Sequence, residues 1–288
     1  MVNKVSIGLV QIGGEPLAVE ENRDLTVRWT ERAFNAGADI VVLPEMIIHG
    51  YAFDWRALAE TAEPVDGPTV KQWTSLAAEA NGYVVGGFCE RDGESLYNTA
   101  VAVGPDGTIL HYRKTHLFAN EKIAFHDGDL GFPVAHTRFG TIGLCVCYDL
   151  RFVEVVRLMA LKGADLICVP TAWLPGYDKE RWDQDGMCPQ GKGAVLQANL
   201  SQVYIACASQ AGRHGEFDFL GSSILVDPYG KLASGPLPGS EDAISVTEVD
   251  LGAAKRAQVR GELIAPRADR RTDLYGIWEN GLENGLKY

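Results

Sequence analysis

Two cysteines stand one residue apart at the end of an apolar run, in GTIGLCVCYDLRF at residues 140–152. A thiolate is a strong nucleophile, and it forms most readily where a helix N-terminus or a positive charge favours it. Cys147 lies at the turn between a predicted strand and a helix expected to begin near Phe152, so the helix dipole would favour its thiolate. Cys145 lies deeper in the strand and is interpreted as a small buried hydrophobe, an interpretation also open for Cys147 taken alone.

Three further residues could supply acid–base chemistry beside this thiol. Glu45 directly follows the buried run DIVVLP, Lys114 follows an alternating run that ends in HYR, and Glu121 comes seven residues after Lys114. Ligands of open α/β sheets bind beyond the carboxyl ends of the strands, so we expect Glu45 and Cys147 at one such edge. Each residue also has an ordinary interpretation, because a lysine or a glutamate in a loop is most often solvated.

The elements that must position these residues alternate between helices and buried strands. Helical spacing predicts helices over 18–35, 69–82 and 152–163, and continuous apolar runs predict strands covered on both faces. This alternation indicates an α/β fold of packed layers. Three pairs of stretches repeat in the same order, which suggests two related halves that build one composite site: VSIGLVQ (5–11) with GTIGLCV (140–146), AGADIVVLPE (36–45) with KGADLICVPT (162–171), and GPDGTI (104–109) with DPYGKL (227–232).

The ordered set LPE, RKTHLF, a glutamate seven residues after the lysine, and CYDLRF resembles the nitrilase superfamily of carbon–nitrogen hydrolases. The resemblance runs from about Val5 to the RRTDLYG tail near Gly276. It implies a four-layer αββα sandwich, in which two mixed sheets are flanked by helices, with an internal duplication. Two stretches depart from the family pattern: Val153 stands where many members have proline, and residues 181–197, which have no clear match, could shape the substrate pocket.

The same resemblance implies roles for individual residues. Glu45 matches the general base, Lys114 the catalytic lysine, Cys147 the nucleophile, and Glu121 a second glutamate that lines the pocket. Attack on an amide would form a thioester (acyl-enzyme) and release ammonia, with the oxyanion held by Lys114 and a backbone N–H. Water would then hydrolyse the thioester. The supporting positions around the substrate are Tyr148, whose N–H is that donor, Arg151 and Trp173.

Arg151 has two interpretations. An ion pair with Asp149 or Glu154 is favoured, because an arginine near a helix start opposes the dipole and needs a carboxylate partner. The alternative is a substrate carboxylate, as a neighbouring arginine binds in some carbamoylases. CYDLRF resembles amidases and N-carbamoyl amidohydrolases, whereas true nitrilases more often show Cys-Trp-Glu. We therefore expect an amidase acting on a small amide or N-carbamoyl compound; a nitrilase acting on a small nitrile and a non-catalytic amide-binding scaffold are the alternatives.

Composition argues against several classes of partner. The formal net charge is −12 with no basic tract, which disfavours nucleic acid and anionic membranes as partners. No apolar run approaches the roughly 20 residues of a membrane helix, and the N-terminal residues do not resemble a signal peptide. The histidines and cysteines show no metal-ligand spacing, so we expect no metal and no other cofactor. Buried, reduced thiols indicate a cytoplasmic protein without a disulfide framework: Cys89, Cys145, Cys147, Cys168, Cys188 and Cys207.

We expect one carbon–nitrogen hydrolase domain over residues 1–288, with a tail that begins at about residue 266. A monomer would leave the apolar residues of this tail exposed, and similar tails in the superfamily pack across a dimer interface. We therefore expect a homodimer or higher homo-oligomer with the tail (266–288) packed on a partner subunit. The apolar residues concerned lie far from any predicted strand: Leu274, Tyr275, Ile277 and Trp278.

Overall fold

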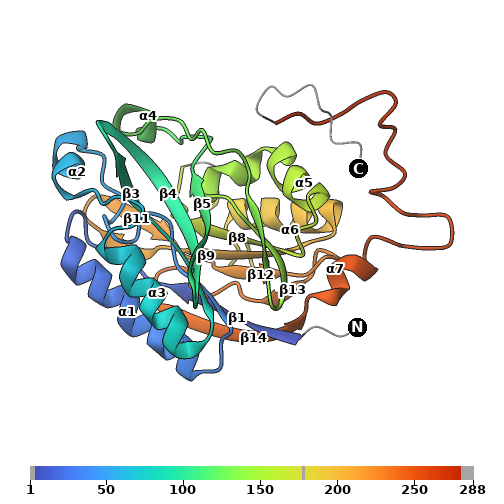
Figure 1. Cartoon of the computed structure of the whole chain (residues 1–288), viewed down its shortest axis with the longest axis horizontal. Helices are drawn as coiled ribbons and strands as arrows, with labels where there is room; N and C mark the ends of the chain where they lie inside the picture. Colours follow the sequence, from blue (N-terminus) through green and yellow to red (C-terminus); the bar gives the residue numbers. More distant parts are fainter. Residues whose placement is uncertain (1–3, 177–178, 280–288) are drawn as a thin grey trace.

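Two six-stranded sheets form the centre of the molecule (Figure 1). The structure is a computed structural model that describes residues 4–176 and 179–279. In spatial order, the first sheet contains β14 (Ala243–Asp250), β1 (Lys4–Gln11), β2 (Ile40–Val42), β3 (Tyr83–Asp92), β4 (Ser95–Gly104) and β5 (Gly107–Arg113). The second contains β13 (Leu232–Ser234), β12 (Ile224–Val226), β9 (Tyr204–Ser209), β8 (Leu166–Thr171), β7 (Gly140–Leu144) and β6 (Val134–Thr137). A separate hairpin pairs β10 (Ala211–His214) with β11 (Phe217–Leu220).

Helices cover the outer face of each sheet. The long helices α1 (Val19–Asn35) and α3 (Pro68–Ala80) pack on the first sheet, and α5 (Val153–Leu161) and α6 (Pro189–Ser201) pack on the second (Figure 1). The result is the predicted αββα sandwich with two mixed sheets. The shorter elements are α2 (Trp55–Thr61), α4 (Glu121–Ala124), the 3₁₀ helix η1 (Cys147–Arg151) and α7 (Gly252–Arg256).

Strands of the sandwich are buried on both faces, which explains the continuous apolar runs in the sequence. In β2, Ile40 and Val42 belong to the core between the sheets, whereas Val41 packs into the core beneath α1 and α3. Side chains alternate between the two faces of a strand, so both sets must be apolar when both faces are covered. The core beneath α1 and α3 also contains Trp73 of α3, which is fully buried.

The two predicted halves have equivalent topology. In each sheet the repeated stretches form neighbouring parallel strands, β1 with β2 in the first and β7 with β8 in the second. The repeated turn sequences join the antiparallel pairs β4–β5 and β12–β13. The halves meet face to face, because β1 packs against β9 and β3 against β8. Residues from one half therefore approach the strand ends of the other.

The segment that had no clear family match, residues 181–197, includes the first part of helix α6, which the sequence analysis did not predict. Two glycines, Gly191 and Gly193, weaken its helical signal, although Pro189 stands at a favourable first-turn position. A Cβ on Gly191 would lie 3.0 Å from Met187 and 3.3 Å from Ile224, so this glycine permits close packing of the helix on β12. In the described part of the chain, no helix combines the length and the apolar character needed to cross a bilayer.

Candidate active site

Cys147 begins the 3₁₀ helix η1 three residues after the end of β7 at Leu144, with a left-handed backbone (φ +45°) that is costly for a residue other than glycine. It is the one cysteine that is only partly buried; the other five are buried, and all six are free thiols. The sequence analysis expected a helix to begin near Phe152, and α5 does begin at Val153. However, η1 separates the thiol from that helix, so the α5 dipole does not act directly at Cys147.

The environment of Cys147 favours the neutral thiol. Burial raises the pKa of Cys147 well above its ordinary value, and the negative charge of Glu45 raises it further. The positive charge of Lys114 and the Ala172 backbone N–H act in the opposite direction, but they do not outweigh burial. The expectation of a favoured thiolate is therefore wrong for the free protein. A thiolate at Cys147 therefore forms only if a neighbouring base takes the thiol proton.

A fully buried lysine between two glutamates supplies charges beside this thiol. Lys114 Nζ donates to Glu45 Oε1 at 2.6 Å and to Glu121 Oε1 at 2.7 Å, and the side chains of all three residues have 0% exposure. Burial disfavours the ammonium, but Glu121 and Glu45 outweigh it and raise the pKa of Lys114. Lys114 is therefore a permanent cation at neutral pH.

Glu45 has one occupied and one vacant carboxylate oxygen. Its Oε1 accepts from Lys114 and from Asn98 Nδ2 at 2.8 Å, whereas Oε2 is buried and has no hydrogen-bond partner. A buried carboxylate oxygen without a donor is costly, so this oxygen is suited to receive a proton or a donor from a bound molecule. The backbone of Glu45 is held by Thr171 and Gln210 of the second half, which places the residue at the sheet–sheet junction.

Glu121 is bound by three donors. Its Oε1 accepts from Tyr51 Oη at 2.7 Å as well as from Lys114, and its Oε2 accepts from the Phe118 backbone N–H at 2.9 Å. Burial raises the pKa of Glu121 to about 7, although Lys114 opposes this shift. Glu121 therefore supports Lys114. It does not line the cavity, as the sequence analysis expected; its neighbours Tyr51 and Phe118 do.

Close backbone approaches fix the segments that carry Glu45 and Lys114. A Cβ on Gly87 of β3 would lie 2.8 Å from the Met46 nitrogen and 3.0 Å from Glu45 Cα. A Cβ on Gly128 would lie 1.9 Å from the Arg113 carbonyl oxygen, and the Gly128 N–H donates to the Lys114 carbonyl at 2.9 Å. Only glycine permits both approaches without a shift of the neighbouring backbone.

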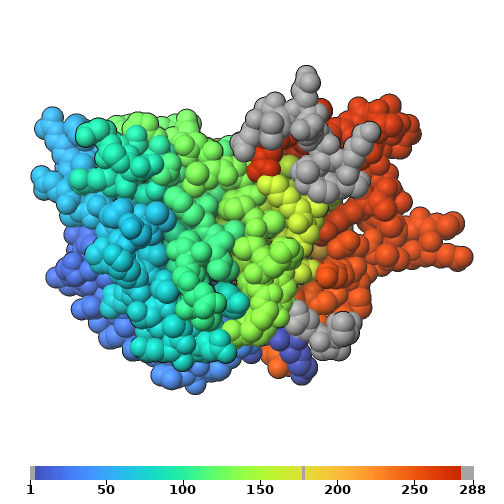
Figure 2. Space-filling view, viewed as in Figure 1, coloured from blue at the N-terminus to red at the C-terminus, as the bar shows by residue number. Residues whose placement is uncertain are grey.

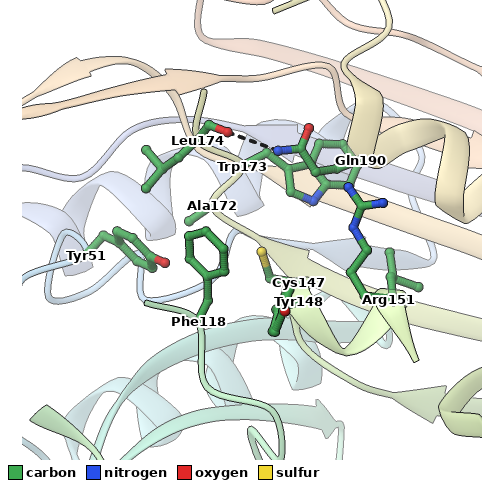
Figure 3. A pocket seen from close by; sticks show the side chains of 10 residues that line it. Tyr51, Phe118, Cys147, Tyr148, Arg151, Ala172, Trp173, Leu174 and Gln190 are labelled. Atoms are coloured by element: carbon green, nitrogen blue, oxygen red, sulfur yellow. Dashed lines mark hydrogen bonds between the residues drawn. The ribbon is translucent and has the colours of Figure 1, made fainter. Parts of the chain in front are cut away.

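A small cavity opens onto the Cys147 sulfur (Figure 3). Three residues singled out in the sequence, Tyr148, Arg151 and Trp173, line it together with Cys147. Figure 3 shows the sulfur facing the space beside Phe118 and Ala172, with the Arg151 guanidinium on the side of Trp173 and Gln190. All seven sequence-derived site residues thus gather at one end of the two sheets. Sequence reasoning missed the other lining residues, Tyr51, Phe118, Leu150, Ala172, Leu174 and Gln190.

One of the missed residues, Gln190, carried a partial signal. Gln190 lies in the segment 181–197, which was expected to shape the pocket; its Nε2 donates to the Leu174 carbonyl at 3.0 Å, and its Oε1 is buried without a partner. Tyr51 carried no such signal, because the residues around it do not indicate its left-handed backbone (φ +59°). Within the described ranges, no group of three His, Cys, Asp or Glu side chains could hold a metal ion.

Comparison with known proteins places these residues in a family. Residues 6–258 match the carbon–nitrogen hydrolase family. The chain is 33% identical to a nitrilase from Pyrococcus abyssi (94% of this chain, 99% of the relative) and 32% identical to an omega-amidase from Xenopus tropicalis (96% and 98%). The structure resembles that of an amidase from Nesterenkonia sp. AN1, with a TM-score of 0.79 at 26% identity, covering 95% of this chain and 96% of that one. The chain therefore belongs to the carbon–nitrogen hydrolase family, as its ordered motifs indicated.

Proposed function

We propose that this hydrolase acts on a small amide or N-carbamoyl compound and releases ammonia through a thioester on Cys147. The observation that carries the proposal is the unpartnered, buried Glu45 Oε2, on a carboxylate that Lys114 holds through Oε1 and near the one partly exposed thiol. The names of the relatives support amide chemistry: one is an omega-amidase, and the Nesterenkonia amidase has been seen with acrylamide added to its active-site cysteine.

Acylation follows from the positions of the donors. Glu45 Oε2 takes the thiol proton, the sulfur attacks the carbonyl carbon, and the oxyanion forms between Lys114 Nζ and the Tyr148 backbone N–H. The ammonium has three N–H donors, and Glu45 and Glu121 occupy two of them, which leaves the third for the oxyanion. Glu45 then transfers its proton to the substrate nitrogen, the C–N bond breaks, and ammonia leaves.

Deacylation uses the same residues with water as the nucleophile. Glu45 Oε2, again unprotonated, accepts a proton from water as the water oxygen attacks the thioester carbon. The oxyanion returns to Lys114 and Tyr148, the C–S bond breaks, and the proton on Glu45 returns to sulfur. The acid is released and Cys147 is again a thiol.

The shape of the pocket supports a short acyl group with a polar end. Phe118, Trp173 and Leu174 supply apolar walls, and Arg151 and Gln190 supply polar atoms at one side. We propose that the polar end of the bound substrate lies on this side of the cavity, which Arg151 and Gln190 border.

A matched amide and nitrile pair with one acyl group tests the proposal. In the amide reaction an oxyanion forms near Lys114, whereas a nitrile places negative charge on nitrogen first. We expect kcat/KM for ammonia release to be higher with the amide at pH 7. A nitrile preference above about tenfold, equivalent to roughly 1.4 kcal/mol, would overturn the amidase assignment. Release of ammonia from neither compound class, with saturable amide binding, would favour the non-catalytic scaffold.

We further propose a cytoplasmic homo-oligomer built from one domain over residues 1–288. Six free cysteines, five of them buried, support a reducing compartment. The exposed apolar side chains of the tail support a partner subunit, since Leu274 is 71% and Trp278 59% exposed. Figure 2 shows this tail projecting from the body at the right. The last part of the proposed interface segment, residues 280–288, lies outside the described residues.

A further inference from the structure

A second buried carboxylate, Asp149, lies in the same turn as Cys147 but is not used by the proposed chemistry. Its exposure is 0%. Oδ2 accepts from the Val146 backbone N–H at 2.9 Å and from Tyr112 Oη at 2.7 Å. Oδ1 accepts from the His116 backbone N–H at 3.1 Å and from His116 Nδ1 at 2.7 Å. Four hydrogen bonds thus converge on one side chain.

These four bonds join the two segments that carry the reacting groups. Val146 immediately precedes Cys147 and belongs to the second sheet's half, whereas Tyr112 and His116 stand two residues before and two residues after Lys114. Tyr112 lies near the end of β5 in the first sheet, and its hydroxyl also bonds to Thr115 at 3.1 Å. Asp149 therefore connects the two halves of the molecule beside the site.

The His116 ring adds a second contact between the same segments. It stacks on Phe152, the residue between η1 and α5, with ring centroids 3.6 Å apart and planes 11° apart. Because the carboxylate can only accept, His116 Nδ1 carries the proton in this bond. The ring is thus held in one orientation by a charge-assisted hydrogen bond at one edge and by stacking on its face.

We propose that Asp149, with His116, is a positioning residue that holds the strained Cys147 turn in register with Lys114; this inference rests on the proposed function. The two oxyanion donors come from different segments, Lys114 from the first half and the Tyr148 N–H from η1. They stabilise one oxygen only if the two segments keep a fixed separation. Asp149 is the side chain whose bonds set that separation, and it also ties down a backbone with φ +45°.

Asp149→Asn tests the proposal most directly. The amide keeps the size of the side chain but replaces one acceptor oxygen by an NH₂ group, which must face two of the four donors. A misplacement of about 1 Å at a reacting group costs about 10²-fold in rate. We expect kcat to fall by about that factor while KM changes less than about threefold. Equal kcat in Asp149→Asn and the wild type would overturn the proposal.

The rate of Cys147 alkylation by iodoacetamide separates positioning from a simple charge effect. Removal of a nearby negative charge would by itself favour the thiolate and speed alkylation. Displacement of Cys147 from Lys114 would remove the cation that favours the thiolate and slow it. We expect alkylation to be about tenfold slower in Asp149→Asn; faster or unchanged alkylation would contradict a positioning role. This readout needs no amide substrate, so failure of the proposed function would leave it intact.

Two His116 variants keep the test decisive if Asp149→Asn does not fold. His116→Asn places an N–H donor near Nδ1 but loses the stacked ring, whereas His116→Phe keeps a stacked ring and loses the donor. We expect kcat to fall about tenfold in His116→Phe, the order expected for one charge-assisted hydrogen bond, and less than about threefold in His116→Asn. Equal losses in both, or a larger loss in His116→Asn, would overturn the proposal.

Asp165→Asn is the matched control. Asp165 is also a buried aspartate (6% exposed), and it accepts from the Thr141 backbone N–H at 3.0 Å. It lies before β8, at the opposite end of the second sheet from Cys147. We expect it to lower the melting temperature while kcat and the alkylation rate stay at wild-type values. A loss of kcat here as large as in Asp149→Asn would show that general destabilisation explains both.

Discussion

At the scale of single residues, two identical thiols differ only in their surroundings. Cys145 and Cys147 are one residue apart, yet Cys145 is packed in the core between the sheets and Cys147 borders the cavity. Burial raises the pKa of both thiols well above the ordinary value, so neither is a free thiolate. Only Cys147 has Lys114 among the charges that lower its pKa. Reactivity therefore comes from neighbours rather than from residue type.

Cys147→Ala is expected to abolish ammonia release, whereas Cys145→Ala keeps most of it. The first change removes the proposed nucleophile, and the second removes a buried sulfur from the core, which lowers stability but not the chemistry. Initial rates on one amide, measured with variants shown to be folded by circular dichroism, check both. Comparable losses in the two variants would contradict the assignment of Cys147.

At the scale of elements, the proposed catalytic groups stand on segments held by close backbone contacts and buried ion pairs. The backbone of Gly128 closely approaches the carbonyl of Arg113, the residue before Lys114. The Arg113 side chain in turn donates to Glu90 at 2.7 Å, which ties β5 to β3 across β4. The position of Lys114 is therefore set by the sheet and by the loop that follows it.

Gly128→Ala is expected to reduce both the melting temperature and kcat. The new Cβ would lie 1.9 Å from the Arg113 oxygen, so the loop and the Lys114 segment must separate. Gly193→Ala is the control, because its Cβ meets nothing within 4 Å inside α6, and it should raise stability by up to about 1 kcal/mol. Thermal melts and kcat on one amide measure both effects. Wild-type kcat in Gly128→Ala would show that this approach does not position Lys114.

Glu90 is expected to make stability depend on acid pH. Burial alone would raise the pKa of Glu90, but hydrogen bonds from His111, Arg113 and Thr99 lower it to about 2. Because the folded pKa is below the ordinary value of 4.5, the contribution, roughly 3 kcal/mol, is present above pH 4.5 and is lost as pH falls towards 2. The free energy of unfolding in urea should therefore fall more between pH 7 and about pH 3 in the wild type than in Glu90→Gln.

The control for Glu90 is Asp92→Asn. Asp92 also accepts from Arg113 at 2.7 Å, but its side chain is 63% exposed, and exposed ion pairs contribute little to stability. Its pH dependence should match that of the wild type. An equally flattened curve in both variants would mean that Arg113, and not the buried Glu90 carboxylate, produces the effect.

At the scale of the whole molecule, exposed apolar side chains gather where the tail meets α5 and α6. Val153, Leu196 and Leu200 are 45–59% exposed on these helices, and a groove runs between the helices and the tail. Arg267 fastens the start of the tail by donating to the carbonyls of Ala160 and Ser201 at the helix ends. The helix surface and the tail thus border one groove that exposes apolar side chains among charged ones, which supports the proposal of a second copy of the chain on this face.

Light scattering at micromolar concentration is expected to give a mass of at least twice the chain mass of 31.3 kDa. Leu200→Lys should shift the population towards the monomer, because it places a charge in the groove. Trp55→Lys, at an exposed position (52%) on α2 at the opposite end of the molecule, should not (Figure 1). A single 31.3 kDa species in the wild type would rule out the proposed oligomer.

Much of this molecule follows from local sequence. The burial of strands on both faces makes them apolar throughout, so β2 and β8 are visible as continuous runs, and the order of the repeats predicts the two halves. Glu45, Lys114 and Cys147 are marked by short motifs, because each follows a strand end, whereas Glu121, at the start of α4, is marked only by its distance of seven residues from Lys114.

Only the tertiary structure decides what surrounds these residues. The unpartnered oxygen of Glu45 and the neutral thiol of Cys147 depend on burial and on charges from separate segments, such as Lys114, which is 69 residues from Glu45 in the sequence. Gln190 and Tyr51 enter the pocket from segments with no distinctive pattern. Asp149 reads as a turn residue in CYDLRF, yet its bonds reach back 33 and 37 residues to the strand and loop around Lys114. Pairings at such separations are set by packing of the two sheets, which no local pattern encodes.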